Sequence, residues 1–262
     1  MKRIFIAPDR PREAVVSWPV RLFNFVLVLV ILAFVFSFAF EQLRYNWKWA
    51  AVWRYRHKFA VGWITTVWLS LAALGLSTLI GLVCALGQRS RLLMLRYFIK
   101  LYVELIRGTP LLIQVLIFFY VVADAFHVGN RYAVGIMTLS IFSGAYITEI
   151  IRAGIESVGR SQLESAMAIG LTRAQIYRYV VFPQALRQTL PPLAGQFVSL
   201  VKDSSLLSII SISEFTLNAQ EVNAFTFSTL ESYLPLTAGY LLLTLPISMW
   251  TRWLERRMRF ET

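Results

Sequence analysis

The sequence predicts an all-α integral membrane protein with about six transmembrane helices. Hydrophobic residues make up 57% of the 262 positions, and charged residues only 15%. Soluble domains average roughly 45–50% apolar and about 25% charged residues. The mean hydropathy of +0.61 points the same way. The apolar residues also gather in runs near the length of about 20 that a spanning helix needs. One bundle without a large soluble domain is therefore expected.

The first apolar run, at 22–40, is interpreted as an extra transmembrane helix that follows a basic segment. It is too long for the apolar region of a cleaved signal peptide, and no small-residue cleavage site follows it. Residues 41–58 combine aromatic and basic side chains, which suits the headgroup layer of a membrane. The sequence thus predicts an N-terminal region, 1–58, made of a cytoplasmic segment, this helix and an interfacial connector. Whether 22–40 truly spans stays open.

Five further runs complete the predicted bundle, at 61–86, about 109–122, 132–151, about 191–212 and about 234–250. The run at 109–122 is the weakest, because its apolar part is short and Pro110 either kinks it or begins it. Small residues in the second span should let a neighbouring helix approach closely: Ala72, Ala73, Gly75, Ser77, Gly81 and Ala85. Residues 59–257 are expected to form one transmembrane domain, followed by a C-terminal tail at 258–262.

Basic residues predict the orientation of the chain, because cytoplasmic loops are enriched in Lys and Arg. Segments 87–100, 152–187 and 252–262 carry four, five and four basic residues, whereas 124–131 has one and 211–234 has none. Both termini are therefore predicted to be cytoplasmic, in a multi-pass membrane protein. The loop between the first two spans disagrees, since its five basic residues would face outward.

Composition argues against several other classes of protein. The net charge of +12 sits in short loops beside apolar runs, which suits lipid headgroups and not nucleic acid. Cys84 is the single cysteine, so no disulfide framework is expected. His57 and His127 lie too far apart to form a local ligand pair. We therefore predict no metal site and no cofactor bound by this chain.

Residues 161–183 carry helix punctuation that can be interpreted residue by residue. Ser161 with Glu164, and later Thr172 with Gln175, have the spacing of capping boxes. Gly170 lies between them and suits the left-handed turn that often follows a helix. With Pro183 expected to end the second helix, the pattern predicts a helix, a glycine elbow and a second helix. A DNA-binding pair, a connecting loop and a docking element for a cytoplasmic partner are the alternatives, and the position between two spans favours docking.

The same segment resembles the EAA loop of permease subunits of binding-protein-dependent ABC importers. The family pattern is EAA, three residues, Gly, nine residues and I-x-L-P. It matches Glu164, Ser165, Ala166, Gly170, Val180, Phe182 and Pro183 with conservative departures. ELIRGTPLLIQ at 104–114, SGAYITEIIRAGI at 143–155 and VKDSSLLS at 201–208 are similar to the polar amino acid subfamily, whose substrates include His, Glu, Gln, Arg and opines.

This resemblance implies a type I ABC importer permease fold with an extra N-terminal helix, in a bacterial inner membrane. It implies that the 161–183 loop couples to a groove of a cytoplasmic ABC ATPase subunit, through Glu164, Ser165, Ala166, Gly170, Thr172 and Pro183. It also implies an external solute-binding protein and a second permease subunit, identical or not. The family commonly has five spans, so the run at 22–40 is a departure.

Polar side chains within the predicted spans are candidates for a translocation path. Ionisable groups in a membrane cost several kcal/mol unless they are paired or face a wet cavity. Helical spacing puts Gln196, Ser199 and Asp203 on one face, beside Lys202. Ser143 and Glu149 are the further candidates on the fourth span. An equally open alternative is that Lys202 and Asp203 pair with neighbouring helices and only hold the bundle together.

Two ion pairs are also predicted from spacing along a helix. Glu149 and Arg152 lie three residues apart, and Glu104 and Arg107 repeat that spacing, so each pair can meet on one helix face.

An ATP-driven importer subunit is the function that the sequence favours. No G-x-x-x-x-G-K-[ST] run is present, so ATP and Mg²⁺ should be bound by a partner ATPase, and the chain should be a transporter subunit without enzymatic activity. An ion-driven carrier would normally show two repeated halves, which are not found. A membrane enzyme would need clustered acid-base residues, whereas the candidates in this sequence are scattered over different spans. The substrate is expected to be a polar amino acid, of a side-chain class that the sequence does not specify.

Overall fold

The computed structural model describes residues 18–43 and 45–258. Residues 1–17 of the predicted cytoplasmic segment, Arg44 of the connector and residues 259–262 of the predicted tail lie outside the described residues. The chain divides into two compact units, Met1–Lys48 and Trp49–Thr262.

The first unit contains one described helix, α2 (Trp18–Leu43). Its stretch Trp18–Gln42 is long and apolar enough to cross a membrane, and none of its most apolar window is buried. A helix that is apolar on every side suits lipid surroundings. The helix predicted at 22–40 is therefore confirmed as a candidate span.

The second unit is helical throughout its described part, with no strand there. Its elements are α3 (Trp49–Trp53), α4 (Arg56–Gly87), α5 (Leu93–Gly108), α6 (Leu111–Ile117) with a π-helical turn (Phe118–Ala123), α7 (Arg131–Glu156), α8 (Arg160–Ala168), α9 (Arg173–Ile176) with a π-helical turn (Tyr177–Val181), α10 (Phe182–Asp203) with a 3₁₀ turn (Ser204–Ile210), α11 (Phe215–Thr226) and α12 (Thr229–Met258).

Five helical stretches among the described residues can cross a membrane by length and composition, and a sixth is bent. The five are α2, α4, α7, Arg173–Ile210 and α12. The sixth combines α5 with α6 and its π turn, which meet at an angle of 111°. The prediction of about six spans is confirmed, but the span expected at about 109–122 is a bent pair of helices that begins earlier, at Leu93.

Pro110 and Gln114 form the corner between α5 and α6. Pro110 has an extended ψ of 136° and is the cap residue just before α6, so the helix starts at the next residue, Leu111. The Gln114 amide donates to the Ile106 carbonyl at 2.7 Å and to the Thr109 hydroxyl at 2.8 Å. These bonds tie α6 back to the end of α5 and satisfy polar groups that the break leaves open.

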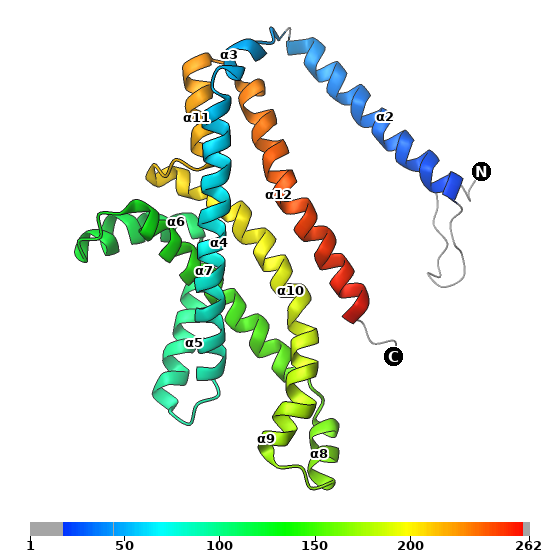
Figure 1. Ribbon diagram of the computed structural model, residues 1–262, viewed down its shortest axis with the longest axis vertical. Helices are drawn as coiled ribbons and strands as arrows, with labels where there is room; N and C mark the ends of the chain where they lie inside the picture. The colour runs from blue at the N-terminus through cyan, green and yellow to red at the C-terminus, as the bar shows by residue number, and fades with distance from the viewer. Residues whose placement is uncertain (1–17, 44, 259–262) are drawn as a thin grey trace. The chain divides into compact units, whose positions relative to one another are not determined.

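Close packing of α4 on α7 forms the centre of the second unit, with α10 against both (Figure 1). Ala73, Ser77, Gly81 and Ala85 recur every fourth residue of α4 and are buried. The Ser140 hydroxyl donates to the Ala73 carbonyl at 3.3 Å, which shows how near the two backbones lie. The predicted role of small residues in helix approach is confirmed here, although at Gly75 no heavy atom lies within 4 Å of the position that a Cβ would take.

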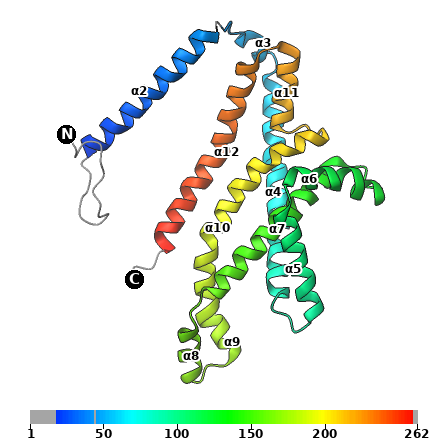
Figure 2. The same cartoon turned by 180° about the vertical axis from the view of Figure 1, so that it is seen from behind.

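A shared apolar core joins α4, α6, α7 and the end of α10. It comprises Leu69, Ala73, Leu111, Val115, Ile136, Leu139, Leu200, Leu207, Ile210 and Ile212. Seen from behind, α8 and α9 lie at the same end of this unit as the α4–α5 loop, and α3 and α11 lie at the other end (Figure 2). The core therefore separates two ends, and the candidate coupling segment, residues 161–183, belongs to one of them.

Candidate functional site

The segment from α8 to α9 has the helix, glycine elbow and helix that the sequence predicts. Gly170 has a φ of +83°, a left-handed conformation that a residue with a Cβ adopts at a cost. Thr172 then caps α9. Its hydroxyl accepts from the backbone N–H of Gln175, and the side-chain oxygen of Gln175 accepts from the backbone N–H of Thr172 at 2.8 Å. The elbow and the second capping box are confirmed.

The first capping box is wrong. Helix α8 begins at Arg160, with Gly159 as the preceding cap and no side-chain cap hydrogen bond. Ser161 therefore lies inside the first turn and not before it, so its hydroxyl is not placed to accept from the free N–H groups at the start of the helix, and it forms no capping box with Glu164. Gly159 takes the extended cap conformation in its place, with ψ of 140°.

Pro183 does not end the second helix, contrary to the prediction. Helix continues from Arg173 to Ile210, with Pro183 in the first turn of α10 and two further prolines inside it. A proline lacks the N–H that would bond four residues back, and its ring crowds that carbonyl. The π-helical turn Tyr177–Val181 lies immediately before, and such a turn shifts the bonding pattern where a proline would clash. The α9 helix and the spanning helix α10 therefore form one rod.

A small apolar core of its own stiffens this segment. Val158, Ala166, Ile176 and Val181 are buried together, packed by Leu163 and Leu171 among others. Of the predicted coupling residues, Ala166 belongs to this core, whereas Glu164, Ser165, Gly170, Thr172 and Pro183 are exposed. The core thus holds the exposed residues in fixed relative positions.

Apolar side chains are also exposed on the coupling segment. Ile169 is 77% exposed, and Met167, Tyr179 and Phe182 are exposed by more than half. An apolar group next to polar residues is typical of a protein contact surface. The segment therefore offers a surface on a rigid support that continues into a spanning helix.

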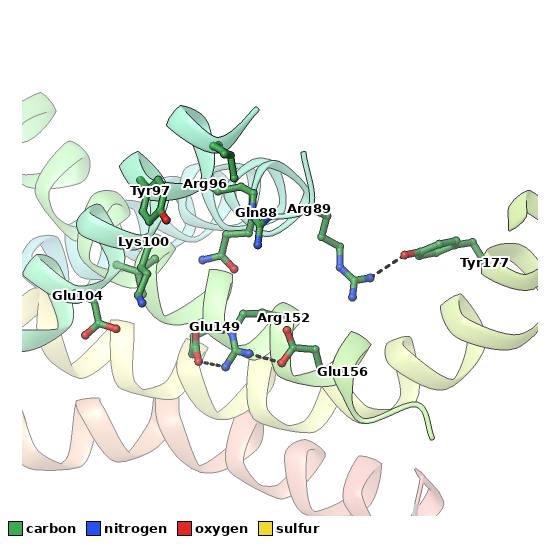
Figure 3. Close-up of a pocket in the computed structure, with 12 residues that line it drawn as sticks. Gln88, Arg89, Arg96, Tyr97, Lys100, Glu104, Glu149, Arg152, Glu156 and Tyr177 are labelled. Atoms are coloured by element: carbon green, nitrogen blue, oxygen red, sulfur yellow. Dashed lines mark hydrogen bonds and ion pairs between the residues drawn. The ribbon is translucent and has the colours of Figure 1, made fainter. Parts of the chain in front are cut away.

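A charged cavity of about 800 Å³ opens beside this segment (Figure 3). Helix α5 supplies one wall, the end of α7 a second, and the loop after α4 a third. Its lining residues are Gln88, Arg89, Leu93, Arg96, Tyr97, Lys100, Val103, Glu104, Glu149, Arg152, Glu156 and Tyr177. Tyr177 belongs to the π turn after α9, and its hydroxyl accepts from the Arg89 guanidinium at 3.1 Å. The cavity and the coupling segment are therefore in direct contact.

Ion pairs run along the α7 wall of the cavity. Arg152 pairs with Glu149 and with Glu156, one turn away on each side. The Glu149–Arg152 pair predicted from spacing is confirmed. The Glu104–Arg107 pair is wrong: the Arg107 guanidinium lies 3.9 Å from Glu149 and over the Tyr146 ring, so it joins α5 to α7. Glu104 lines the cavity instead.

The predicted path residues fall into separate surroundings. Gln196 of α10 donates to the Ser143 hydroxyl of α7 at 3.2 Å, where Ser143 is buried. Ser199 and Asp203 are partly buried on α10, and Lys202 is exposed. Glu149 lies on the cavity wall. The structure therefore brings Ser143 and Gln196 together and keeps Glu149 with the charged cavity.

Sequence reasoning missed Glu214, which is fully buried before α11. Its carboxylate accepts from the Thr216 and Leu217 N–H groups at 2.8 and 2.7 Å, and from the Tyr240 hydroxyl of α12 at 3.2 Å. Burial raises the pKa of the Glu214 carboxyl, and the two backbone hydrogen bonds oppose that rise. The available signal was an acidic residue directly after the apolar run at 191–212.

Sequence reasoning also missed Arg89 and Tyr177, which touch across the cavity. They lie 88 positions apart in the chain, and no local pattern predicts a contact between such distant residues.

Comparison with known proteins gives a family match. A family model described as "Binding-protein-dependent transport system inner membrane component" matches residues 77–260. The glutamine transport system permease protein GlnP of Escherichia coli (strain K12) is 34% identical over 213 residues, which cover 80% of this chain and 97% of that protein. The L-cystine transport system permease protein TcyB of Bacillus subtilis (strain 168) is 36% identical over 195 residues, 74% of this chain and 83% of that protein.

Solved structures are similar as well. A chain of an amino acid ABC transporter crystallised with histidines matches with a TM-score of 0.76 and 34% identity, covering 81% of this chain and 100% of that one. An inward-facing MetNI methionine ABC transporter matches with a TM-score of 0.64. At 15% identity, over 77% of this chain and 96% of that one, the second likeness is one of fold alone.

Proposed function

The chain belongs to the inner membrane components of binding-protein-dependent transport systems, and we propose that it is the permease subunit of an ATP-driven amino acid importer. Family membership and the apolar helices support a multi-pass protein of the inner membrane. Amino acids are proposed as cargo because GlnP, TcyB and the amino acid ABC transporter are similar over most of this chain.

The partner of the coupling segment in this proposal is a cytoplasmic ABC ATPase, which binds ATP and Mg²⁺. The observation that carries the proposal is the continuous helical stretch Arg173–Ile210, which joins α9 to α10 and follows the Gly170 elbow. A partner that pushes on the exposed residues Glu164, Ser165 and Thr172 would move α10 directly. The proline that follows, Pro183, lies within the rod and does not interrupt it.

Transport proceeds by alternating access in this proposal. ATP-driven closure of the ATPase favours one of two arrangements of the bundle, and the equilibrium shifts only as far as the partner binds the two arrangements differently. A solute-binding protein delivers cargo on the outer side, and a second permease subunit completes the pore. Both chain termini are proposed to be cytoplasmic, on the side of the coupling segment.

The translocation path is proposed to follow the polar face of α10. Gln196, Ser199 and Asp203 share that face, with Lys202 beside it. The hydrogen bond from Gln196 to Ser143 supports a polar contact between α10 and α7 in the apolar interior. Glu149 is proposed to act at the inner end, because it lies on the charged cavity.

Gly170→Val tests the coupling assignment. No heavy atom lies within 4 Å of the position a Cβ would take, so the substitution strains only the backbone, by about 1–2 kcal/mol for a left-handed L-residue. Gly170→Asn is the matched control, because Asn tolerates this conformation better. We expect the tagged valine variant to insert in the membrane but to lose a P-loop ATPase that co-purifies with the wild type and the asparagine variant. Equal ATPase recovery from both variants would contradict docking at the elbow.

A further inference from the structure

Charges in the cavity beside α5 and α7 are divided between its walls. Basic side chains come from α5 and from the loop before it, namely Arg89, Arg96 and Lys100. The α7 wall presents Glu149, Arg152 and Glu156, and Arg152 is already bound by its two neighbours (Figure 3). That wall therefore contributes two carboxylates against one guanidinium, and it faces a basic wall across open space.

Besides Arg89, which donates to the Tyr177 hydroxyl, three charged groups of the lining are left without an ion partner in the described part of the chain. No ion pair formed there includes Arg96, Lys100 or Glu104. All three lie on α5 at positions four residues apart, so they form one stripe along the helix facing the cavity. Positive and negative groups are thus available side by side, at a spacing fixed by a single helix.

We propose that this cavity binds a zwitterionic amino acid on the coupling side of the permease. Arg96 and Lys100 bind the α-carboxylate, and Glu104, with Glu156 across the cavity, binds the α-ammonium. The proposal rests on the proposed import function, since it gives the inner end of the route a ligand. A volume of about 800 Å³ also leaves room for a variable side chain and for water.

Charge balance favours a zwitterion over a ligand of one sign. The lining carries four basic residues, Arg89, Arg96, Lys100 and Arg152, and three acidic residues, Glu104, Glu149 and Glu156. A simple anion would meet three carboxylates, and a simple cation would meet four basic groups. An α-amino acid presents both signs on adjacent atoms and can satisfy both walls.

Contact with the coupling segment gives such a site a mechanical connection. The Arg89 guanidinium donates to the Tyr177 hydroxyl and lies 5.9 Å from the centre of its ring. Tyr177 is in the rod that joins α9 to α10. A displacement of the coupling segment therefore changes the wall of the cavity and the affinity of the proposed site.

The test is calorimetric titration of the full-length chain in phosphatidylcholine nanodiscs. L-glutamine, L-glutamate, L-arginine and L-histidine are the probes, with the deaminated and decarboxylated analogues of each amino acid that binds. We expect at least one amino acid to bind and each analogue that lacks the α-amino or the α-carboxyl group to bind at least tenfold more weakly, because it loses one charged group that the site hydrogen-bonds. Absence of binding for all four up to 10 mM (roughly the weakest affinity class) would overturn the proposal.

Variants assign the binding to this cavity. Arg96→Gln and Glu104→Gln should each weaken the binding at least tenfold. Arg91→Gln and Glu255→Gln, which change exposed charges outside the lining, should leave it unchanged. Unchanged amino acid binding in the two cavity variants would refute the site. The site would also be refuted if the binding signal appeared only with added phosphatidylglycerol and depended on Arg96 alone, which is the result expected for a lipid headgroup.

Recovery of the partner ATPase separates the two proposals. Arg96→Gln and Glu104→Gln should still co-purify with the ATPase, so loss of amino acid binding with normal ATPase recovery concerns the cavity alone. Absence of any ATPase from the wild-type preparation would instead count against the importer function.

Discussion

Gly81→Ala should weaken the packing of α4 on α7. A Cβ at position 81 would lie 2.3 Å from the Ile147 Cγ2 and 2.7 Å from its Cβ, with the Thr148 backbone nitrogen at 3.2 Å. Ile147 is fully buried and β-branched, so its χ1 has little freedom to move aside. Relief requires a shift of one helix backbone, and overpacking of this kind costs about 1–3 kcal/mol.

Gly75→Ala is the matched control on the same helix. No heavy atom lies within 4 Å of its Cβ position, so only helix propensity changes. Alanine is favoured over glycine by about 1 kcal/mol inside a helix, and this gain applies equally at both positions. The difference between the two variants therefore isolates the clash, at about 1–3 kcal/mol.

Unfolding of the purified variants in detergent, followed by circular dichroism against denaturant, measures this difference. We expect the midpoint of Gly81→Ala to fall below that of Gly75→Ala, with the wild type between them or near the control. Equal midpoints for the two variants would refute the reasoning, because they would show that α4 and α7 separate at no cost where the structure puts them in contact.

Three further predictions concern the coupling segment, the buried acid and the path. Thr172→Ala removes the α9 cap and should lower the free energy of local opening at 173–176 by about 1 kcal/mol, measured as faster amide exchange. Ser161→Ala removes no cap and should leave this exchange unchanged. Equal exchange in both variants would contradict the capping assignment. Burial raises the folded-state pKa of Glu214, so its protonated form favours folding. Stability should be greatest below about pH 4.5, fall as the pH rises toward the folded-state pKa and then level off. Thermal unfolding from pH 4 to 8 should show this fall in the wild type and not in Glu214→Gln. Asp203→Asn should reduce amino acid uptake in proteoliposomes with normal recovery of the complex, whereas unchanged uptake with poor recovery would favour a role in holding the bundle together.

Local signals predicted the elements of this fold well where each signal depends on only a few neighbouring residues. The left-handed Gly170 and the Thr172–Gln175 box follow from backbone sterics and from hydrogen bonds three residues apart. Hydropathy found the spans for the same reason, since a run of apolar residues is itself the requirement for crossing a membrane. The helix bounds were less accurate, because polar turns continue beyond the apolar core of a span.

Errors arose where a rule about one residue competed with its surroundings. Proline usually ends a helix, which is the basis of the prediction for Pro183. Here a π turn before Pro183 accommodates its ring, and α9 continues into α10. Arg107 is spaced to pair with Glu104 but binds Glu149 of another helix, and the contact between Arg89 and Tyr177 likewise depends on how distant elements meet. Tertiary contacts of this kind have no sequence period, so the cavity could not be predicted from the sequence.

The rod from Arg173 to Ile210 has a consequence for how this segment can change during evolution. No loop separates the capped start of α9 from the polar face of α10, so no flexible residues are present to absorb a change in length. Deleting one residue between them would turn every later side chain by about 100° and move it by about 1.5 Å along the axis. Gln196 would then leave Ser143 even though both residues were kept. Substitutions should therefore accumulate in this stretch of related chains, whereas insertions and deletions should be absent from it.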